Sequence, residues 1–339
     1  MNSPTLHTIS ELSIDDVNSF LLEEFPSDKA QFLINHGDWL HKGNENRFAL
    51  ELGGKIIGYF GIIPTKVIWK GEKKEAFWWI DLIISKSGRG KGYQTIVDDY
   101  IRNRSELKLG FPNKFAAGIH RKHNWKVYNH LKVMLLPIIP SKSSIFKKKK
   151  SQTLGKILDN IFGSLIKLGS NYSTQYAQKE SNPNFKEYAD LFNSRIKSNT
   201  TTMRDESFFI WRYDESPFKR DYMYYSSKKR GEPHIILIAR KKYFDQGLSI
   251  RIIDVIGNIN DKKRFIDLVK LVISDSISLG ANQITVLETN TKLQFWFLLC
   301  GFIIFTKARF CFYPDLGNEN EHPINMSWSF VDSDNDFLD

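Results

Sequence analysis

The chain is 339 residues long, with 41% hydrophobic and 25% charged residues, a composition that indicates a folded globular protein and excludes a disordered one. This length suits two domains of about 150 to 170 residues each. A formal net charge of +10 is compatible with an anionic partner, but it does not choose among a nucleotide ligand, nucleic acid and acidic lipid. Cys300 and Cys311, the only cysteines, lie in no metal-ligand spacing, so neither a disulfide nor a metal site is expected.

The N-terminal residues have neither a basic start nor an apolar core, so we expect no signal peptide. The longest apolar run, 295–305, is far shorter than the roughly 20 residues that span a bilayer. The sequence therefore predicts a cytoplasmic protein.

The first half of the chain alternates strands and helices in a readable order. The predicted elements are helices over 10–40, two strands paired through the Gly53-Gly54 turn, a strand at 76–85, a glycine-rich turn, a helix at about 93–107, a short strand at 109–111 and a helix from Asn113.

The glycine-rich turn at 87–92 is built to approach an anion. Gly90 and Gly92 allow positive φ, and the N–H groups that open the following helix point outward. Arg89 and Lys91 add positive charge beside them. The spacing matches neither the P-loop nor the G-x-G-x-x-G fingerprint, which leaves an anion site of another kind or an ordinary surface turn.

With Arg89 first and Gly92 fourth, the turn resembles the R-x-x-G-x-[G/A] turn of the GNAT acyl-CoA N-acyltransferases, although Gln94 stands where a small residue is usual and could crowd the phosphates. The order of elements is also similar to the GNAT fold, in which the central strands splay and CoA lies in the gap. The resemblance implies an α/β (α+β) fold with a mixed, mostly antiparallel twisted sheet flanked by helices, and acetyl-CoA or another short acyl-CoA as co-substrate. It implies cofactor contacts from Ile83, Ile84, Ser85, Arg89, Gly90, Lys91, Gly92, Tyr93, Gln94, Thr95 and Asn113, with a backbone N–H near Ile84 as donor to the acyl oxygen.

A second GNAT landmark is a helix opened by Asn, with Ala, Tyr and Gly-Phe at fixed places after it. Here Asn113 is followed by Ala116, His120 and the pair Asn124-Trp125. Asn124 in place of Gly is physically reasonable, because Asn accepts the left-handed conformation that ends a helix. Asn113 can serve as a helix N-cap, with or without a role in cofactor binding.

Asp81 and His120 are the candidate catalytic residues. A carboxylate at Asp81, among apolar strand residues, can act as a general base if burial raises its pKa, and the alternative is a structural aspartate. His120 stands where the family often has a Tyr acid, and an imidazolium can protonate a leaving thiolate. The alternative is a solvent-exposed histidine beside basic neighbours.

The same register recurs in the second half of the chain. Asn290 is followed by Phe297 and Gly301-Phe302 at the matching places, and Asp254 precedes it much as Asp81 precedes Asn113. We therefore predict a second, degenerate GNAT-like copy, which has lost the glycine-rich turn and forms a wall of the acceptor cleft. Two unrelated α/β domains are the alternative. The expected domains are 1–140, with the acyl-CoA site, a basic linker and amphipathic helix at 141–180, and 181–339.

The linker contains lysines at 147–150 and an apolar stripe on one helical face. That face either packs on one of the domains or, through residues 146–168, contacts the inner membrane surface peripherally.

These patterns predict an acyl-CoA-dependent N-acyltransferase, with acetyl as the expected acyl group, that acts on a small-molecule primary amine or a glycan. The resemblance extends to acyltransferases of bacterial surface-polysaccharide biosynthesis and so favours an amino sugar, free or nucleotide-linked. One alternative is Fem-type aminoacyl-tRNA-dependent transfer to a peptidoglycan precursor, and another is a non-catalytic GNAT-fold binding protein. Nucleic acid is not an expected partner, because the Lys and Arg residues are spread along the chain, and the sequence does not predict the oligomeric state.

Overall fold

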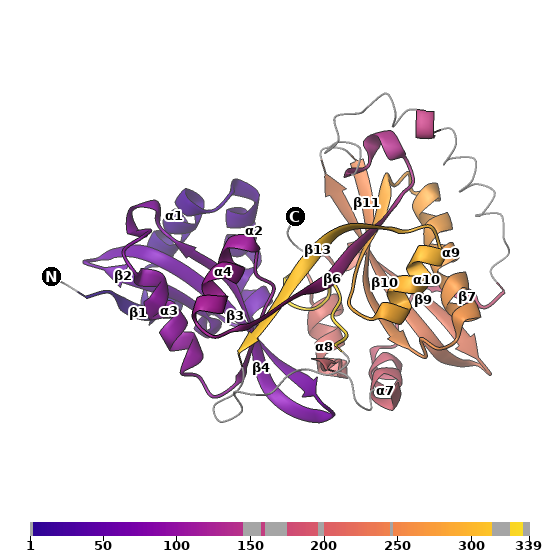
Figure 1. Ribbon diagram of the computed structural model, residues 1–339, viewed down its shortest axis with the longest axis horizontal. Helices are drawn as coiled ribbons and strands as arrows, with labels where there is room; N and C mark the ends of the chain where they lie inside the picture. Colours follow the sequence, from indigo (N-terminus) through magenta and orange to yellow (C-terminus); the bar gives the residue numbers. More distant parts are fainter. Residues whose placement is uncertain are drawn as a thin grey trace. The chain divides into compact units, whose positions relative to one another are not determined.

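The computed structural model describes residues 3–144, 157–159, 175–195, 200–244, 247–313 and 326–334, which form two compact units. Figure 1 shows the chain path through both of them. Among the described residues, unit 1 consists of 3–129, 309–313 and 333–334, and unit 2 contains the others.

Unit 1 is a mixed sheet with helices. The sheet order is β1-β2-β3-β4-β5-β13, and every neighbouring pair is antiparallel except β4 and β5, which run parallel. The elements are β1 (Thr5–Thr8), α1 (Ile14–Glu24), α2 (Ser27–His41), β2 (Arg47–Leu52), β3 (Lys55–Trp69), β4 (Glu72–Ile84), α3 (Tyr93–Arg102), β5 (Leu107–Gly110), α4 (Lys114–Lys122) and the end of β13 (Ile303–Tyr313).

Local chemistry explains much of this unit. Gly53 and Gly54 adopt φ of 59° and 78° in the predicted hairpin turn between β2 and β3. The helical region expected over 10–40 is two helices, because Pro26 precedes the first residue of α2 and ends the run before it. Val97 and Ile101, one turn apart on α3, pack into a buried cluster with Phe60 and other sheet residues.

Strands β4 and β5 diverge at a bulge. They pair only from Ala76 to Trp78, and the register between β3 and β4 shifts just beyond that point. Asp81 sits in the shifted segment with a φ of 61°, which is costly for a residue with a Cβ and marks a bulge that the surroundings hold in place. The edge of β4 beyond the bulge therefore faces a gap rather than a neighbouring strand.

Unit 2 repeats this plan. Its sheet order is β6-β12-β11-β10-β9-β7, with β11 and β12 parallel and the other pairs antiparallel. A large buried cluster joins α9 and α10 to the sheet, against which Figure 1 shows both helices. The elements are β6 (Lys126–Pro137), β7 (Ala177–Glu180), α7 (Phe185–Arg195), β8 (Thr201–Thr202), α8 (Glu206–Phe209), β9 (Tyr222–Lys229), β10 (Glu232–Phe244), β11 (Gly247–Gly257), α9 (Lys262–Ser278), β12 (Gln283–Glu288) and α10 (Thr291–Leu299).

The two halves of the chain exchange their last strands. β6 follows α4 of unit 1, but its residues 132–137 pair with β12 in unit 2. β13 follows α10 of unit 2, and Cys311 to Tyr313 pair with β5 in unit 1. The predicted domains, with boundaries at 140 and 180, are continuous segments of the sequence and so do not include this exchange. Apolar patterning shows that a segment is a strand, but it does not specify which strand pairs with it.

The predicted fold class is confirmed: each unit has a mixed, mostly antiparallel sheet flanked by helices. No helix within the described part of the chain is long and apolar enough to cross a membrane. The predicted membrane-contacting helix at 146–168 lies outside the described residues except for 157–159.

Candidate functional site

A cavity of about 660 Å³ lies in unit 1, in the gap that opens between β4 and β5. One wall is β4 after its bulge, another is the first part of α4, and the glycine-rich turn and α3 contribute Arg89 and Gln94. Seven predicted site residues line this cavity: Asp81, Ile83, Ile84, Arg89, Gln94, Asn113 and His120. The other six, Ser85, Gly90, Lys91, Gly92, Tyr93 and Thr95, form the adjoining turn and the first turn of α3.

The glycine-rich turn leaves the N-terminus of α3 without a side-chain cap. Gly90 and Gly92 have φ of 79° and 82°, and Gly92 is the N-cap residue. Among the described residues no side chain accepts from the amides of Tyr93 and Gln94, whereas the Thr95 amide donates to the Gly92 carbonyl at 2.9 Å. The first two N–H groups of α3 can therefore meet an anion. The carbonyl oxygen of Ser85 accepts hydrogen bonds from the amides of Gly88 and Arg89, which holds the start of the turn against the end of β4.

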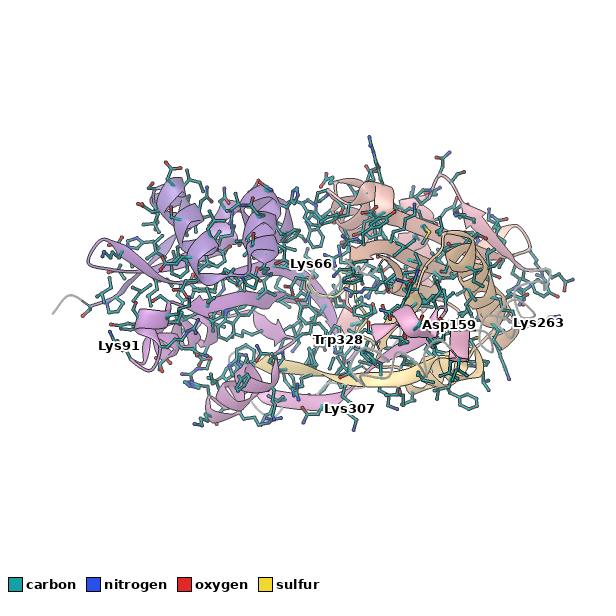
Figure 2. All side chains as sticks on the ribbon, turned by 90° about the horizontal axis from the view of Figure 1, so that it is seen from above. Lys66, Lys91, Asp159, Lys263, Lys307 and Trp328 are labelled. Carbon is teal, nitrogen blue, oxygen red and sulfur yellow. The ribbon has the colours of Figure 1, made fainter. Side chains whose placement is uncertain are left out.

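Two cations flank the turn. The Nε–H of Arg89 donates to the Ile84 carbonyl at 3.1 Å, and its guanidinium lies 3.6 Å from the Glu24 carboxylate, while 57% of the side chain remains exposed. Lys91 is exposed and is labelled in Figure 2. Gln94 is half-buried in the cavity wall, so its side chain shares the space in which a phosphate would lie.

The Asp81 carboxylate is paired rather than poised to take up a proton. Its side chain is 2% exposed, forms an ion pair with Lys29 and lies 3.4 Å from His41. Burial alone would raise the pKa of Asp81, but Lys29 and His41 outweigh burial and hold it at about 2. A carboxylate with this pKa is a weak base at neutral pH, which favours the structural alternative for Asp81.

His120 is buried, so the solvent-exposed alternative is wrong. Its ring packs against Trp79 at 5.2 Å and Trp125 at 4.6 Å between centroids. Burial, with a smaller contribution from His123, lowers the pKa of His120 to about 4. The ring is therefore a neutral imidazole at neutral pH, and it can exchange hydrogen bonds with a ligand without supplying the imidazolium that the sequence suggested.

Asn113 caps α4. Its side-chain oxygen accepts from the amides of Phe115 and Ala116 at 3.0 and 2.9 Å. The helix ends at Lys122, and Asn124, the residue after the C-cap His123, has a φ of 66°, the left-handed conformation expected there. The N-cap role is confirmed, and a contact with the cofactor stays a prediction.

Sequence reasoning missed the residues that surround Asp81. Burial tends to lower the pKa of Lys29, but Asp81 and Asp334 reverse this effect and raise it. The Lys29 amine lies 3.5 Å from Asp334, and Ser333 and Asp334 line the cavity from the other end of the chain. No local motif joins such distant positions. In the sequence, only the isolated Lys29 in the apolar pattern of α2 could have indicated a buried ion pair.

The described ranges contain no group of His, Cys, Asp and Glu side chains that could hold a metal ion.

No family model matches the chain, and no curated protein matches it. Several solved structures, however, match the chain. A GCN5-related N-acetyltransferase from Anabaena variabilis is 14% identical with a TM-score of 0.62, over 92% of this chain and 72% of that one. N-myristoyltransferase of Saccharomyces cerevisiae with bound myristoyl-CoA is 12% identical, also with a TM-score of 0.62, over 92% of this chain and 78% of that one.

A GCN5-related N-acetyltransferase from Kribbella flavida is 11% identical with a TM-score of 0.56, over 92% of this chain and 71% of that one. At these identities the likeness shows the fold. Because it spans both units and the two sheets repeat one plan, the prediction of two GNAT-like domains in tandem is confirmed.

Proposed function

We propose that the protein is an acyl-CoA-dependent N-acyltransferase whose acyl-CoA site is the unit 1 cavity. One observation carries the proposal: the gap between β4 and β5 ends at a helix N-terminus without a side-chain cap, with Arg89 beside it. The pyrophosphate would lie on the first amides of α3, and the pantetheine arm would run along the unpaired edge of β4. The likeness to acyltransferase structures supports this reading through the fold.

In the proposed reaction the acceptor amine attacks the thioester carbonyl carbon, so that a C–N bond forms and the C–S bond breaks. The amine loses one proton and the leaving thiolate takes up one, exchanged through water. A backbone N–H of β4 near Ile84 would stabilise the oxyanion, because the strand edge beyond the bulge faces the cavity. Asp81 would act by fixing the bulge rather than by taking a proton, since its pKa is about 2. His120, neutral in its aromatic surroundings, would hydrogen-bond the sulfur or the acyl group.

The acceptor in this proposal is a primary amine, with an amino sugar as the first compound to test. That choice comes from the sequence resemblance, and an acetyl group is the first acyl group to test for the same reason.

A second candidate is a non-catalytic acyl-CoA-binding protein. It is favoured by one observation: both expected proton-transfer residues have a pKa that is unsuited to the task, about 2 for Asp81 and about 4 for His120.

Thermal unfolding with acetyl-CoA tests the binding site. At about a hundred times the dissociation constant the ligand should add about 2.7 kcal/mol to the free energy of unfolding. Arg89→Glu should remove most of this shift, whereas Lys66→Glu, the same charge change at an exposed lysine of β3 (Figure 2), should preserve it. A wild-type protein that shows no shift would refute the proposed site.

Release of free thiol from acetyl-CoA in the presence of amino sugars then separates the two candidates. Turnover that depends on the amine establishes the transferase. Binding without turnover across acyl chains and amines favours the non-catalytic protein.

A further inference from the structure

Unit 2 contains a cavity of about 530 Å³ at the place that corresponds to the unit 1 cavity. β11 and β12 pair from Ser249 to Ile252 and then diverge, and the register with β10 shifts beside Asp254. Asn290 caps α10 through the amides of Lys292 and Leu293, as Asn113 caps α4. The repeat therefore preserves the gap in which the unit 1 cavity lies.

The lining of this second cavity is polar, whereas aromatic and aliphatic side chains dominate the first one. Hydroxyl groups come from Thr201, Ser327 and Ser329, the last two on either side of Trp328, which is labelled in Figure 2. Amide side chains come from the loop after β11, at Asn258 and Asn260. A lining of hydroxyls and amides fits a ligand that carries several hydroxyl groups.

The helix N-terminus beside this cavity is not open to a phosphate. The Asp261 side chain caps the N-terminus of α9, accepting from the Arg264 amide at 3.3 Å, and also pairs with the Arg264 guanidinium at 2.8 Å. The helix end that would hold a pyrophosphate is thus already occupied by a carboxylate. The loop Asn258–Asp261 contains no basic residue, unlike the turn with Arg89 and Lys91.

Glu288 lies where unit 1 has Phe111, two residues before the helix cap. It is 4% exposed, lines the cavity, and one of its carboxylate oxygens accepts from the Asn290 amide at 2.7 Å. Burial raises the pKa of Glu288 to about 8; Asp254 adds to the shift and Arg204 opposes it.

Two nearby cations already have partners. Arg204 binds Asp254 at 2.6 Å and Asp332 at 3.3 Å, and the Lys292 amine donates to the Asn260 side chain. Lys132 is the partner of Glu288 across the β6–β12 pair, but no ion pair joins Glu288 to it or to any other cation of the described residues. A positively charged ligand group would therefore complete the site.

We propose that the unit 2 cavity binds a small polyhydroxylated primary amine, with its ammonium group against Glu288 and its hydroxyl groups on Thr201, Ser327 and the loop amides. On binding, the Glu288 carboxyl group releases its proton to the solvent and the carboxylate pairs with the ammonium. No covalent bond changes. The site lies in the other unit from the proposed acyl-CoA cavity, and its existence does not depend on acyl transfer.

Titration calorimetry with glucosamine and glucose tests the proposal, because the two sugars differ by one amino group in place of a hydroxyl. We expect glucosamine to bind the full-length protein at least tenfold more tightly than glucose does. Near pH 6.5, in two buffers of different ionisation enthalpy, binding should release about one proton. Glu288→Gln, similar in shape but unable to ionise, should lower the affinity at least tenfold and abolish the proton release.

Ser327→Phe, which narrows the cavity while Glu288 itself is unchanged, should also abolish binding. This second variant keeps the proposal testable if Glu288→Gln fails to fold. Arg89→Glu should leave glucosamine binding unchanged while it removes the acetyl-CoA shift, so the two proposals can fail separately. Equal affinity for both sugars, no binding of glucosamine, or unchanged binding by Ser327→Phe would overturn the proposal.

Discussion

The turn after β4 and the turn after β11 occupy the same place in the two units, yet only the first leaves its helix N-terminus open. In unit 1 the N-cap is Gly92, and within the described part of the chain no side chain bonds to the first two amides of α3. In unit 2 the N-cap is Asp261, whose carboxylate accepts from the third amide of α9. The same backbone plan therefore gives an open or a closed helix N-terminus according to the identity of a single cap residue.

The two units agree, by contrast, in having a buried carboxylate that is paired with a cation beside the bulge. Asp81 pairs with Lys29 and His41, and Asp254 pairs with Arg204. The cations come from unrelated places in the sequence, but each neutralises a carboxylate next to the divergence of two parallel strands. Because this pairing is kept where the glycine-rich turn is absent, it favours a structural role for Asp81 at the gap.

Removing either cation should have the largest effect on stability and tests whether both ion pairs support the gap between the parallel strands. Arg204→Met should lower the free energy of unfolding by about 3 to 5 kcal/mol, because it leaves the buried Asp254 carboxylate without its cation. Lys29→Met should lower it by about 3 kcal/mol, the lower end of this range, because His41 remains 3.4 Å from Asp81. Urea unfolding of the two variants measures the loss. In the double variant Lys29→Met with Asp81→Asn much of the stability should return. A loss below about 1 kcal/mol in either single variant would break the parallel between the units.

Much of the fold could be predicted because its determinants are local. Asn113 and Asn290 cap helices, and Asn124 and Gly301 end them with φ of 66° and 90°, as the residue types demand. The exchange of β6 and β13 could not be predicted, because strand pairing depends on contacts distant in sequence. For His120 the sequence left a catalytic acid and a solvent-exposed histidine as alternatives. Its ring turns inward against two tryptophans, an orientation that the helical pattern alone does not specify.

The second largest effect is a pH dependence of stability that comes from His120. Unit 2 has no counterpart to it, because Phe297 takes the place of His120 there. Because the pKa of His120 falls to about 4 from an ordinary value of 6.5, the unfolded chain binds more protons between these values. Stability is therefore fully present above pH 6.5 and is lost as the pH falls toward 4, by about 3 kcal/mol. His120→Gln should show a correspondingly shallower loss in urea unfolding across this range, and an identical pH profile in the variant would contradict the burial of the imidazole.

Asp81 should also make stability depend on pH, but at lower pH and with a smaller change in the free energy of unfolding than His120. Its pKa of about 2 lies below the ordinary 3.8, so its contribution is present above pH 4 and is lost as the pH falls toward 2. This loss amounts to about 2 kcal/mol. Comparing the acid unfolding of the wild type with Asp81→Asn isolates the contribution. A raised pKa, as a general base requires, would instead make the wild type lose stability as the pH rises above 4, and that result would restore the catalytic reading.

The smallest effect separates the two roles of Asn113 by using Asn290 as its internal control. Each side chain accepts from two amides at the start of its helix, so Asn113→Ala and Asn290→Ala should each cost about 1 kcal/mol of unfolding free energy. Serine preserves a cap oxygen, so Asn113→Ser and Asn290→Ser should both retain most of the stability. If Asn113 also contacts the cofactor through its amide nitrogen, Asn113→Ser should reduce the acetyl-CoA shift while Asn290→Ser leaves it intact. Equal shifts in both serine variants would confine Asn113 to capping, and the resemblance between the two helices would then be one of architecture alone.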